Sequence, residues 1–217
     1  MDIHQNIAML SGIMMTNNCY TGIGSRETPD DILILMRRIG YIMAMKGVAL
    51  RTGEADGADH AFYKGVVDAN DINGVKFKNE VFVAGTPKEY HYVNDIVDIF
   101  SSDLMLEAPL QGFRETAVRI RGSWNDLSYF GAKCHIRNVA QVLGVDGKSP
   151  SRGLICWAKP VNSIKVTDSK MRYVVGGTNT AYCTAILHNI PVYNLHELEH
   201  RVYFEDWVNQ ELDKLGS

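Results

Sequence analysis

Residues 18–31 have the sequence NCYTGIGSRETPDD, and this stretch is the most informative one for the fold class. Its first half is a short apolar run that ends in Gly22-Ile23-Gly24, which is typical of a buried strand followed by a tight loop. Its second half starts a helix: Thr28 stands in the capping position, Pro29 takes the first helical position, and two aspartates follow that suit the helix dipole. The stretch predicts a strand, a glycine loop and a helix in succession.

The same alternation of strand and helix continues along the chain. Further strands are expected at 48–53, 80–85, 153–157, 171–175 and 191–195, and helices are expected up to about 46 and at 58–69, 91–100, 115–120, 128–143, 180–188 and 203–215. Apolar strands that alternate with helices are typical of a parallel sheet covered on both faces. The predicted fold class is therefore α/β, a Rossmann-like doubly wound, mainly parallel sheet with helices on both faces.

No linker, repeat or low-complexity tract divides the chain. We therefore expect a single domain over residues 1–217, with an N-terminal extension at 1–17 and a C-terminal helical tail at 196–217. No apolar run approaches the ~20 residues of a membrane helix, and the N-terminus lacks a signal-peptide pattern, so we expect a cytoplasmic protein with no membrane partner. The four cysteines are scattered, which favours free thiols.

The charge balance limits the possible partners. The chain has 22 Lys and Arg against 25 Asp and Glu, a net charge of −3, which argues against avid, nonspecific duplex binding. Charge is nevertheless unevenly distributed. Residues 114–138 carry five basic and two acidic residues, and residues 194–217 carry six acidic and two basic ones. A compact ligand with few phosphates fits this balance better than a long nucleic-acid track.

Three loops share one pattern, in which an apolar strand is followed by glycines with small or hydroxyl residues and then by a helix. Glycine lets backbone N–H groups approach a ligand closely, and the helix N-terminus behind each loop favours an anion. All three loops are expected at the carboxyl edge of the sheet, where open α/β folds bind ligands. The candidate ligand-binding residues in them are Gly24, Ser25, Arg26, Gly53, Glu54, Asp56, Gly57, Asp59, Gly176, Gly177, Thr178, Asn179 and Thr180.

Arg26 is the preferred phosphate partner, because a guanidinium group binds phosphate oxygens bidentately. His135 is a further candidate for contact with a phosphate or a base. The loops match neither G-x-x-x-x-G-K-[ST] nor G-x-G-x-x-G, which disfavours a P-loop nucleotidase or an ordinary dinucleotide dehydrogenase. His196-Glu-Leu-Glu-His200 satisfies H-E-x-x-H, but no downstream histidine supplies a third ligand, so we expect neither a metal site nor a cofactor.

These motifs resemble the Rossmann-like SLOG superfamily, which groups the DNA-processing protein DprA with the LOG nucleotide phosphoribohydrolases. The resemblance is nearest to DprA-like proteins of bacteriophages, and it covers roughly Tyr20 to Leu195. It rests on Gly24-Ser25-Arg26, the loop 52–62, the pair Arg137-Asn138 and the stretch 176–194. It implies a ligand pocket built from the same loops, with Arg137 and Asn138 at the DprA Arg-Asn pair. It also implies a homo-oligomer and, for a phage protein, the host cytoplasm.

The sequence departs from the family at two places. Glu54, Asp56 and Asp59 put three acids beside a loop that, by the resemblance, would hold phosphate. The position of the LOG catalytic glutamate is Cys183, and that of the third LOG glycine is Asn179. If the chain were an enzyme, Glu27, Glu54 or Asp56 would have to serve as acid or base.

Three functions stay open at this point. The first is binding of a nucleotide-derived, phosphate-containing small molecule, including sequestration of a nucleotide signal. The second is hydrolysis or transfer at a nucleotide N-glycosidic bond. The third is a DprA-like mediator of recombination that binds single-stranded DNA.

Overall fold

The computed structural model describes residues 18–74, 76–85, 97–101, 107–168 and 170–215. In chain order the elements are β1 (Cys19–Gly24), α2 (Asp30–Met45), β2 (Ala49–Thr52), α3 (Ala58–Asn73), β3 (Asn79–Val83), β4 (Val97–Ser101), α4 (Glu107–Arg121), α5 (Tyr129–Leu143), β5 (Leu154–Trp157), β6 (Pro160–Thr167), β7 (Lys170–Val174), α6 (Thr178–Leu187), β8 (Val192–Asn194) and α7 (Leu198–Leu215).

Six strands form one sheet in the order β4-β3-β2-β1-β5-β8, and every neighbouring pair is parallel. This order and the covering helices confirm the predicted Rossmann-like α/β class. From β1 the chain builds outward on one side to β2, β3 and β4, and it then returns to place β5 on the other side of β1. The strand order therefore reverses between β1 and β5, and open α/β sheets bind ligands beside the carboxyl ends of strands at such a point.

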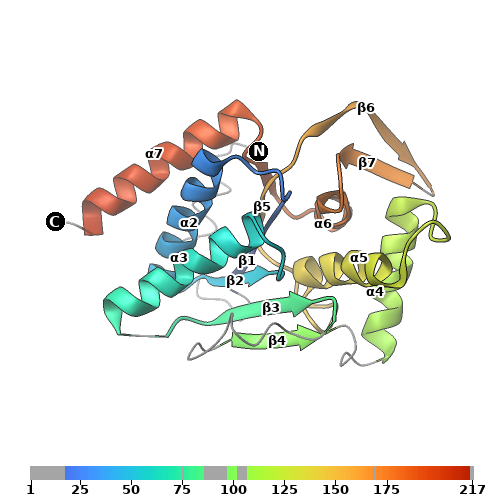
Figure 1. Ribbon diagram of the computed structural model, residues 1–217, viewed down its shortest axis with the longest axis horizontal. Coiled ribbons are helices and arrows are strands. Elements are labelled where there is room, and N and C mark those ends of the chain that lie inside the picture. Colours follow the sequence, from blue (N-terminus) through green and yellow to red (C-terminus); the bar gives the residue numbers. More distant parts are fainter. Residues whose placement is uncertain (1–17, 75, 86–96, 102–106, 169, 216–217) are drawn as a thin grey trace.

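The two faces of the sheet carry separate helical layers. Figure 1 shows α2, α3 and α7 on one side of the sheet and α4, α5 and α6 on the other. The alternation of side chains along β5 serves both layers, since Ile155 belongs to the core under α2, α3 and α7, whereas Leu154 and Cys156 belong to the core under α4, α5 and α6. The C-terminal helix α7 is part of the first layer, because Phe204 and Val208 are buried in its core.

Helices α2 and α3 pack unusually closely, because each has a glycine at the contact. A Cβ built on Gly65 would overlap the backbone carbonyl of Arg37 and lie 2.7 Å from the backbone nitrogen of Tyr41. A Cβ built on Gly40 would likewise overlap the backbone of Phe62. Side chains at these two positions would force the helices apart, so the glycines set the distance between α2 and α3.

One predicted element has the wrong type. A helix was expected at 91–100, but Val97–Ser101 forms strand β4, which pairs in parallel with β3. Residues 91–96 lie outside the described part of the chain. The stretch 97–100 reads Val-Asp-Ile-Phe, and so short an apolar run does not distinguish a helix from a strand by its periodicity. Pairing with β3 decides between them.

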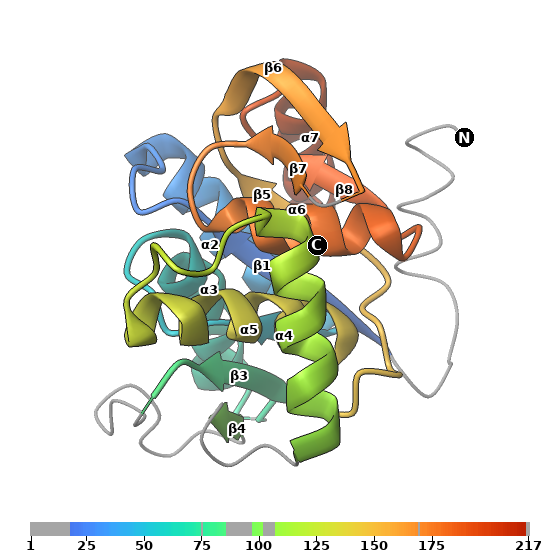
Figure 2. The ribbon, with the colours of Figure 1, turned by 90° about the vertical axis from the view of Figure 1, so that its right-hand side faces the viewer.

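A second correction concerns the third glycine loop. The strand before it, β7, is not part of the main sheet; it pairs antiparallel with β6 in a separate two-stranded ribbon. Strand β6 was not predicted, because nearly all of its residues are exposed and no buried face marks it in the sequence. Figure 2 shows this ribbon beside α6, above the crossing of α4 and α5. The third loop thus follows the ribbon rather than a strand of the sheet.

Three helix starts also differ from expectation. Helix α7 begins at Leu198 rather than Tyr203. Thr28 was predicted to cap α2, but the cap residue is Pro29, and the Thr28 hydroxyl instead donates a 2.6 Å hydrogen bond to the carbonyl of Ser25. Helix α4 starts at Glu107 rather than Glu115. It accepts Pro109 in its first turn, where a missing N–H costs no helical hydrogen bond. Among the described residues, no helix is both long and apolar enough to cross a membrane.

Candidate functional site

A cavity of about 440 Å³ opens at the third glycine loop, over the N-terminus of α6. Several residues predicted to bind ligand line it, namely His135, Gly176, Gly177, Asn179 and Thr180. Gly177 is the N-cap of α6, so the positive end of the helix dipole lies at this loop. The N–H groups of Asn179 and Thr180 donate to the carbonyls of Gly176, at 3.3 Å, and Gly177, at 3.1 Å. Gly176 adopts a φ of +83°, a conformation that favours glycine.

Three cationic side chains complete the lining, and none of them was predicted individually as a ligand residue. Arg121 comes from the end of α4, and Lys170 and Arg172 come from β7. Arg121 is paired with Asp126, at 2.7 Å between Nη2 and Oδ2, so the lining keeps a surplus of positive charge. The sequence signal that could have identified Lys170 and Arg172 is their alternation with Met171. It places both basic residues on one face of a strand that leads to the loop.

His135 joins the cavity from α5. Its Nδ1 lies 2.6 Å from the Thr180 hydroxyl, and its ring lies against Trp124 with the ring centroids 6.4 Å apart. Burial lowers the pKa of His135 to about 4, and the positive charges of Arg121 and Arg137 act in the same direction. The imidazole is therefore neutral near pH 7, and it can donate or accept one hydrogen bond without adding charge.

Asn179 lines the cavity, but its amide holds the ribbon. Its Oδ1 accepts hydrogen bonds from the backbone N–H groups of Tyr173, at 2.9 Å, and Val174, at 3.2 Å, and its Nδ2 donates to the carbonyl of Met171. The side chain thus fixes β7 against the start of α6. This contact positions Lys170 and Arg172 with respect to the glycine loop.

The first two glycine loops contact each other beside β1. A Cβ built on Gly57, whose φ is +89°, would lie 3.4 Å from the Cα of Arg26 and from the carbonyl of Ser25. A Cβ on Gly24 would overlap the methyl group of Ala58, the first residue of α3. Arg26 itself is exposed and is not among the described residues that line the cavity at α6. The tight packing explains why both loops need glycine.

Asp59 lies inside the protein, beneath Gly53. Its side chain is fully buried and forms an ion pair with Arg137, at 3.8 Å between Oδ2 and Nη1, and it accepts a 3.3 Å hydrogen bond from the backbone N–H of Ala55. Burial raises the pKa of Asp59 to about 6, against the opposing effects of Arg137, of the Ala55 and Gly24 N–H groups and of Arg26. The Gly24 N–H lies close enough to lower the pKa of Asp59. Among the described residues, however, no group forms a hydrogen bond with Oδ1.

Arg137 and Asn138 connect the second glycine loop to the third. Arg137 is 9% exposed; it pairs with Asp59 and donates to the Asn138 Oδ1, at 2.9 Å from Nη2. Asn138 Nδ2 donates to the carbonyl of Gly177, also at 2.9 Å. The two residues therefore form a buried chain of polar contacts from α3 to α6. Contact of a ligand with Arg137 and Asn138 stays a prediction.

The acids proposed for an enzyme are spread over the surface near the first two loops. Glu27 forms an exposed ion pair with Lys159 at 2.9 Å. Glu54 is half-buried and Asp56 is exposed. Cys183 stands where the resemblance places a catalytic glutamate; burial raises the pKa of its thiol to about 12, so it is protonated near pH 7.

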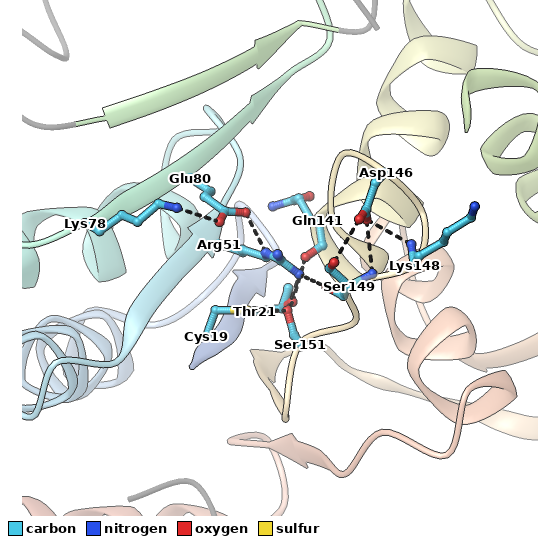
Figure 3. Close-up of polar contacts among 10 residues, drawn as sticks. All are labelled: Cys19, Thr21, Arg51, Lys78, Glu80, Gln141, Asp146, Lys148, Ser149 and Ser151. Carbon is cyan, nitrogen blue, oxygen red and sulfur yellow. Dashed lines mark hydrogen bonds and ion pairs between the residues drawn. The ribbon is translucent and has the colours of Figure 1, made fainter. Parts of the chain in front are cut away.

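A second polar cluster lies at the amino ends of the central strands, as Figure 3 shows. Arg51 of β2 is 4% exposed; its Nε donates to Glu80 of β3 at 2.6 Å, and Nη1 donates to the carbonyl of Ser149. The Thr21 hydroxyl bonds to Ser151 and to the backbone of Gln141. These contacts tie the loop before β5 to the sheet. The cluster lies at the opposite edge from the glycine loops, and we assign it a structural role.

A further cavity is a groove of about 940 Å³ between α4 and α5, with Trp124 and Tyr129 among its lining residues. Within the described ranges, no group of three or more histidine, cysteine, aspartate or glutamate residues could hold a metal ion. His200 of the H-E-x-x-H motif instead contacts the backbone of Asn194, with 3.2 Å from Nδ1 to the backbone nitrogen.

Comparison of the chain with known proteins found no matching family model, no similar curated protein and no similar solved structure.

Proposed function

We propose that this chain binds a nucleotide-derived, phosphate-containing small molecule, with a phosphate in the cavity over the N-terminus of α6. The observation that carries the proposal is the convergence of Arg121, Lys170 and Arg172 on a glycine-lined helix N-terminus. Backbone N–H groups and guanidinium groups are the donors that proteins use for phosphate oxygens. The neutral His135 offers the ligand a further hydrogen bond without adding positive charge to the site.

Binding without cleavage is the form that the residues favour. The buried Cys183 thiol, whose pKa is raised to about 12, cannot act as an acid or base near pH 7 in the way a carboxylate would. Glu27, Glu54 and Asp56 do not line the cavity. A protein of this kind would hold a nucleotide signal and release it unchanged. Hydrolysis of an N-glycosidic bond and binding of single-stranded DNA remain alternatives that the same experiment distinguishes.

The test combines calorimetric titration with mass spectrometry. Titration with inorganic phosphate, ribose 5-phosphate and the four ribonucleoside monophosphates is expected to show binding by at least one of the organic phosphates. The Lys170→Ala/Arg172→Ala variant is expected to lose affinity by about tenfold or more, since each charge-assisted hydrogen bond contributes about 1.5–3 kcal/mol. Lys148→Ala is the matched control, because Lys148 is exposed at the opposite edge of the sheet.

The bound ligand is then recovered after denaturation. Recovery of intact ligand supports sequestration, whereas free base with ribose phosphate indicates the hydrolase. Tight oligonucleotide binding that Arg137→Ala abolishes indicates the DNA mediator. Equal affinities of the wild type and the Lys170→Ala/Arg172→Ala variant would contradict the proposed site.

A further inference from the structure

The groove of about 940 Å³ between α4 and α5 differs in character from the cavity over α6. Its walls are largely apolar and include two aromatic rings, whereas the lining of the cavity is mainly polar. The large apolar and aromatic residues of the groove are Leu110, Val118, Trp124, Tyr129 and Ile136. Hollows of about 300–1,000 Å³ with apolar walls and a few polar groups are typical of sites for small organic molecules. The groove therefore suits the part of a ligand that the polar cavity does not.

The groove adjoins the cavity along three elements of the fold. At the end of α4, on α5 and in the ribbon, a residue that lines the cavity stands one or two positions from a residue that lines the groove; these pairs are Arg121 and Gly122, His135 and Ile136, and Lys170 and Asp168. The rings of Trp124 and His135 contact each other at this boundary, with their centroids 6.4 Å apart. A ligand that crosses the boundary reaches both hollows.

Both aromatic rings of the groove are held by other parts of the chain. Trp124 is half-buried and packs against the core under α4, α5 and α6. Tyr129 is 79% exposed, and the Lys133 Nζ lies 4.4 Å from the centroid of its ring, which is a cation–π contact. Every nucleobase has a flat π-face that stacks on rings of this kind.

The charged residues of the groove favour a ligand that combines an aromatic ring with negative charge. Its described lining holds three basic and two acidic side chains, namely Arg114, Arg119, Lys133, Glu115 and Asp168. This small positive surplus matches a nucleotide, whereas a purely apolar ligand gains nothing from it. We infer that the groove binds the nucleobase of the ligand against Trp124 and Tyr129, while the phosphate lies in the cavity over α6. The inference rests on the proposed function, because it places a second part of the same ligand.

Calorimetric titration with ribose 5-phosphate and with the four ribonucleoside monophosphates separates the base from the phosphate. At least one nucleotide is expected to bind about tenfold more tightly than ribose 5-phosphate, because stacking on aromatic side chains adds to affinity. Trp124→Leu and Tyr129→Ala are each expected to weaken binding of that nucleotide by about fivefold or more, and to leave the affinity for ribose 5-phosphate unchanged. Phe130→Ala is the matched control, since Phe130 is 59% exposed, follows Tyr129 and is not among the described residues that line the groove.

Trp124 fluorescence gives a second readout that does not depend on the phosphate. The chain has three tryptophans, so Trp157→Phe/Trp207→Phe leaves Trp124 as the only one. Adenosine, guanosine, cytidine and uridine carry no phosphate and are titrated up to about 1 mM. At least one of them is expected to quench Trp124 fluorescence, and Lys170→Ala/Arg172→Ala is expected to leave this quenching unchanged. Trp124→Phe/Trp157→Phe, which keeps only Trp207 on α7, is the control and is expected to show no quenching.

The base site and the phosphate site fail in different ways. Ribose 5-phosphate that does not bind, or that binds the Lys170→Ala/Arg172→Ala variant as tightly as the wild type, would contradict the phosphate site, and the nucleosides then decide on the groove. Nucleotides that bind no more tightly than ribose 5-phosphate would overturn the base site. So would nucleotide affinities that Trp124→Leu and Tyr129→Ala leave unchanged or lower only in parallel with that for ribose 5-phosphate, and so would Trp124 fluorescence that no nucleoside quenches.

Discussion

At the scale of single residues, Asp59 shows how burial changes the chemistry of a predicted ligand residue. It was selected as one of three acids beside a phosphate loop, yet its carboxylate lies in the interior against Arg137. Water is excluded there, and the cost of leaving water outweighs the attraction of the nearby guanidinium group, so the pKa rises to about 6. The residue joins the second glycine loop to α5, which explains its presence without a direct contact to ligand.

This pKa predicts a pH dependence of stability. The folded-state pKa of Asp59, about 6, lies above the value of an unfolded aspartate, so the folded state binds the proton more tightly. The stabilisation from this group is complete below pH ~4 and is lost as the pH rises through about 6. Relative to Asp59→Asn, the wild type is expected to lose up to about 3 kcal/mol of unfolding free energy over this range.

Urea unfolding of both proteins at several pH values measures this difference. Asp213→Asn, at an exposed position, is the control and is expected to show no such trend. If the difference between the wild type and Asp59→Asn were constant from pH 4 to 7, Asp59 would ionise in the protein as it does in the unfolded chain.

At the scale of elements, the β6–β7 ribbon is the part that the candidate site depends on most. Nearly all residues of β6 are exposed, and two-stranded ribbons are marginally stable by themselves. The Asn179 amide attaches the ribbon to α6 by bonds to three backbone groups of β7, and the buried Met171 packs with Ile120 and Cys183. The position of Lys170 and Arg172 at the cavity follows from that attachment.

Asn179→Ala is expected to loosen the ribbon. It leaves the N–H groups of Tyr173 and Val174 without their side-chain acceptor, at a cost of about 1–3 kcal/mol. Amide hydrogen exchange at residues 173 and 174 is expected to accelerate by at least about tenfold, which corresponds to ~1.4 kcal/mol of local stability. Asn162→Ala, at an exposed position on β6, serves as the control. Unchanged exchange at both amides would show that other contacts hold β7.

At the scale of the whole molecule, the sheet joins the two helical layers into one structure. Ile155 packs in one core and its neighbours Leu154 and Cys156 pack in the other, so neither core can be disrupted without affecting the strands of both. That the chain forms one domain stays a prediction, and cooperative unfolding is its measurable consequence.

Tryptophan fluorescence tests this cooperativity. Trp207 packs against the core under α2, α3 and α7, and Trp124 packs against the core under α4, α5 and α6. Variants in which Trp157 and one of these two tryptophans are replaced by phenylalanine, so that a single tryptophan remains, are expected to unfold at the same urea concentration. Val139→Ala, in the second core, is expected to lower the midpoint reported by Trp207 as well, since it removes about 1–3 kcal/mol. A midpoint at Trp207 that Val139→Ala leaves in place would indicate two independent units.

The elements that could be predicted from the sequence are those whose signals are local. The apolar run before Gly24, the helical spacing of α2 and α5, and the glycines that precede α3 and α6 all reflect hydrogen bonds and packing between residues close in the chain. The parallel α/β class followed from these signals. So did the selection of His135, Gly176, Gly177 and Thr180 as candidate ligand residues, which line the cavity at α6. The strand β4 was mistaken for a helix, because only its pairing with β3 distinguishes the two.

Which charged side chains lie close together could be seen only in the folded molecule. Arg121 lies about 50 residues from Lys170 and Arg172, and α4 and β7 bring them to one cavity. The same packing buries Asp59 and Arg137, ties Asn138 to Gly177, and turns Asn179 toward the ribbon. The physical reason is that burial and electrostatic contact depend on distances across the folded molecule, whereas the periodicity of a sequence reports only which side of its own helix or strand a residue faces.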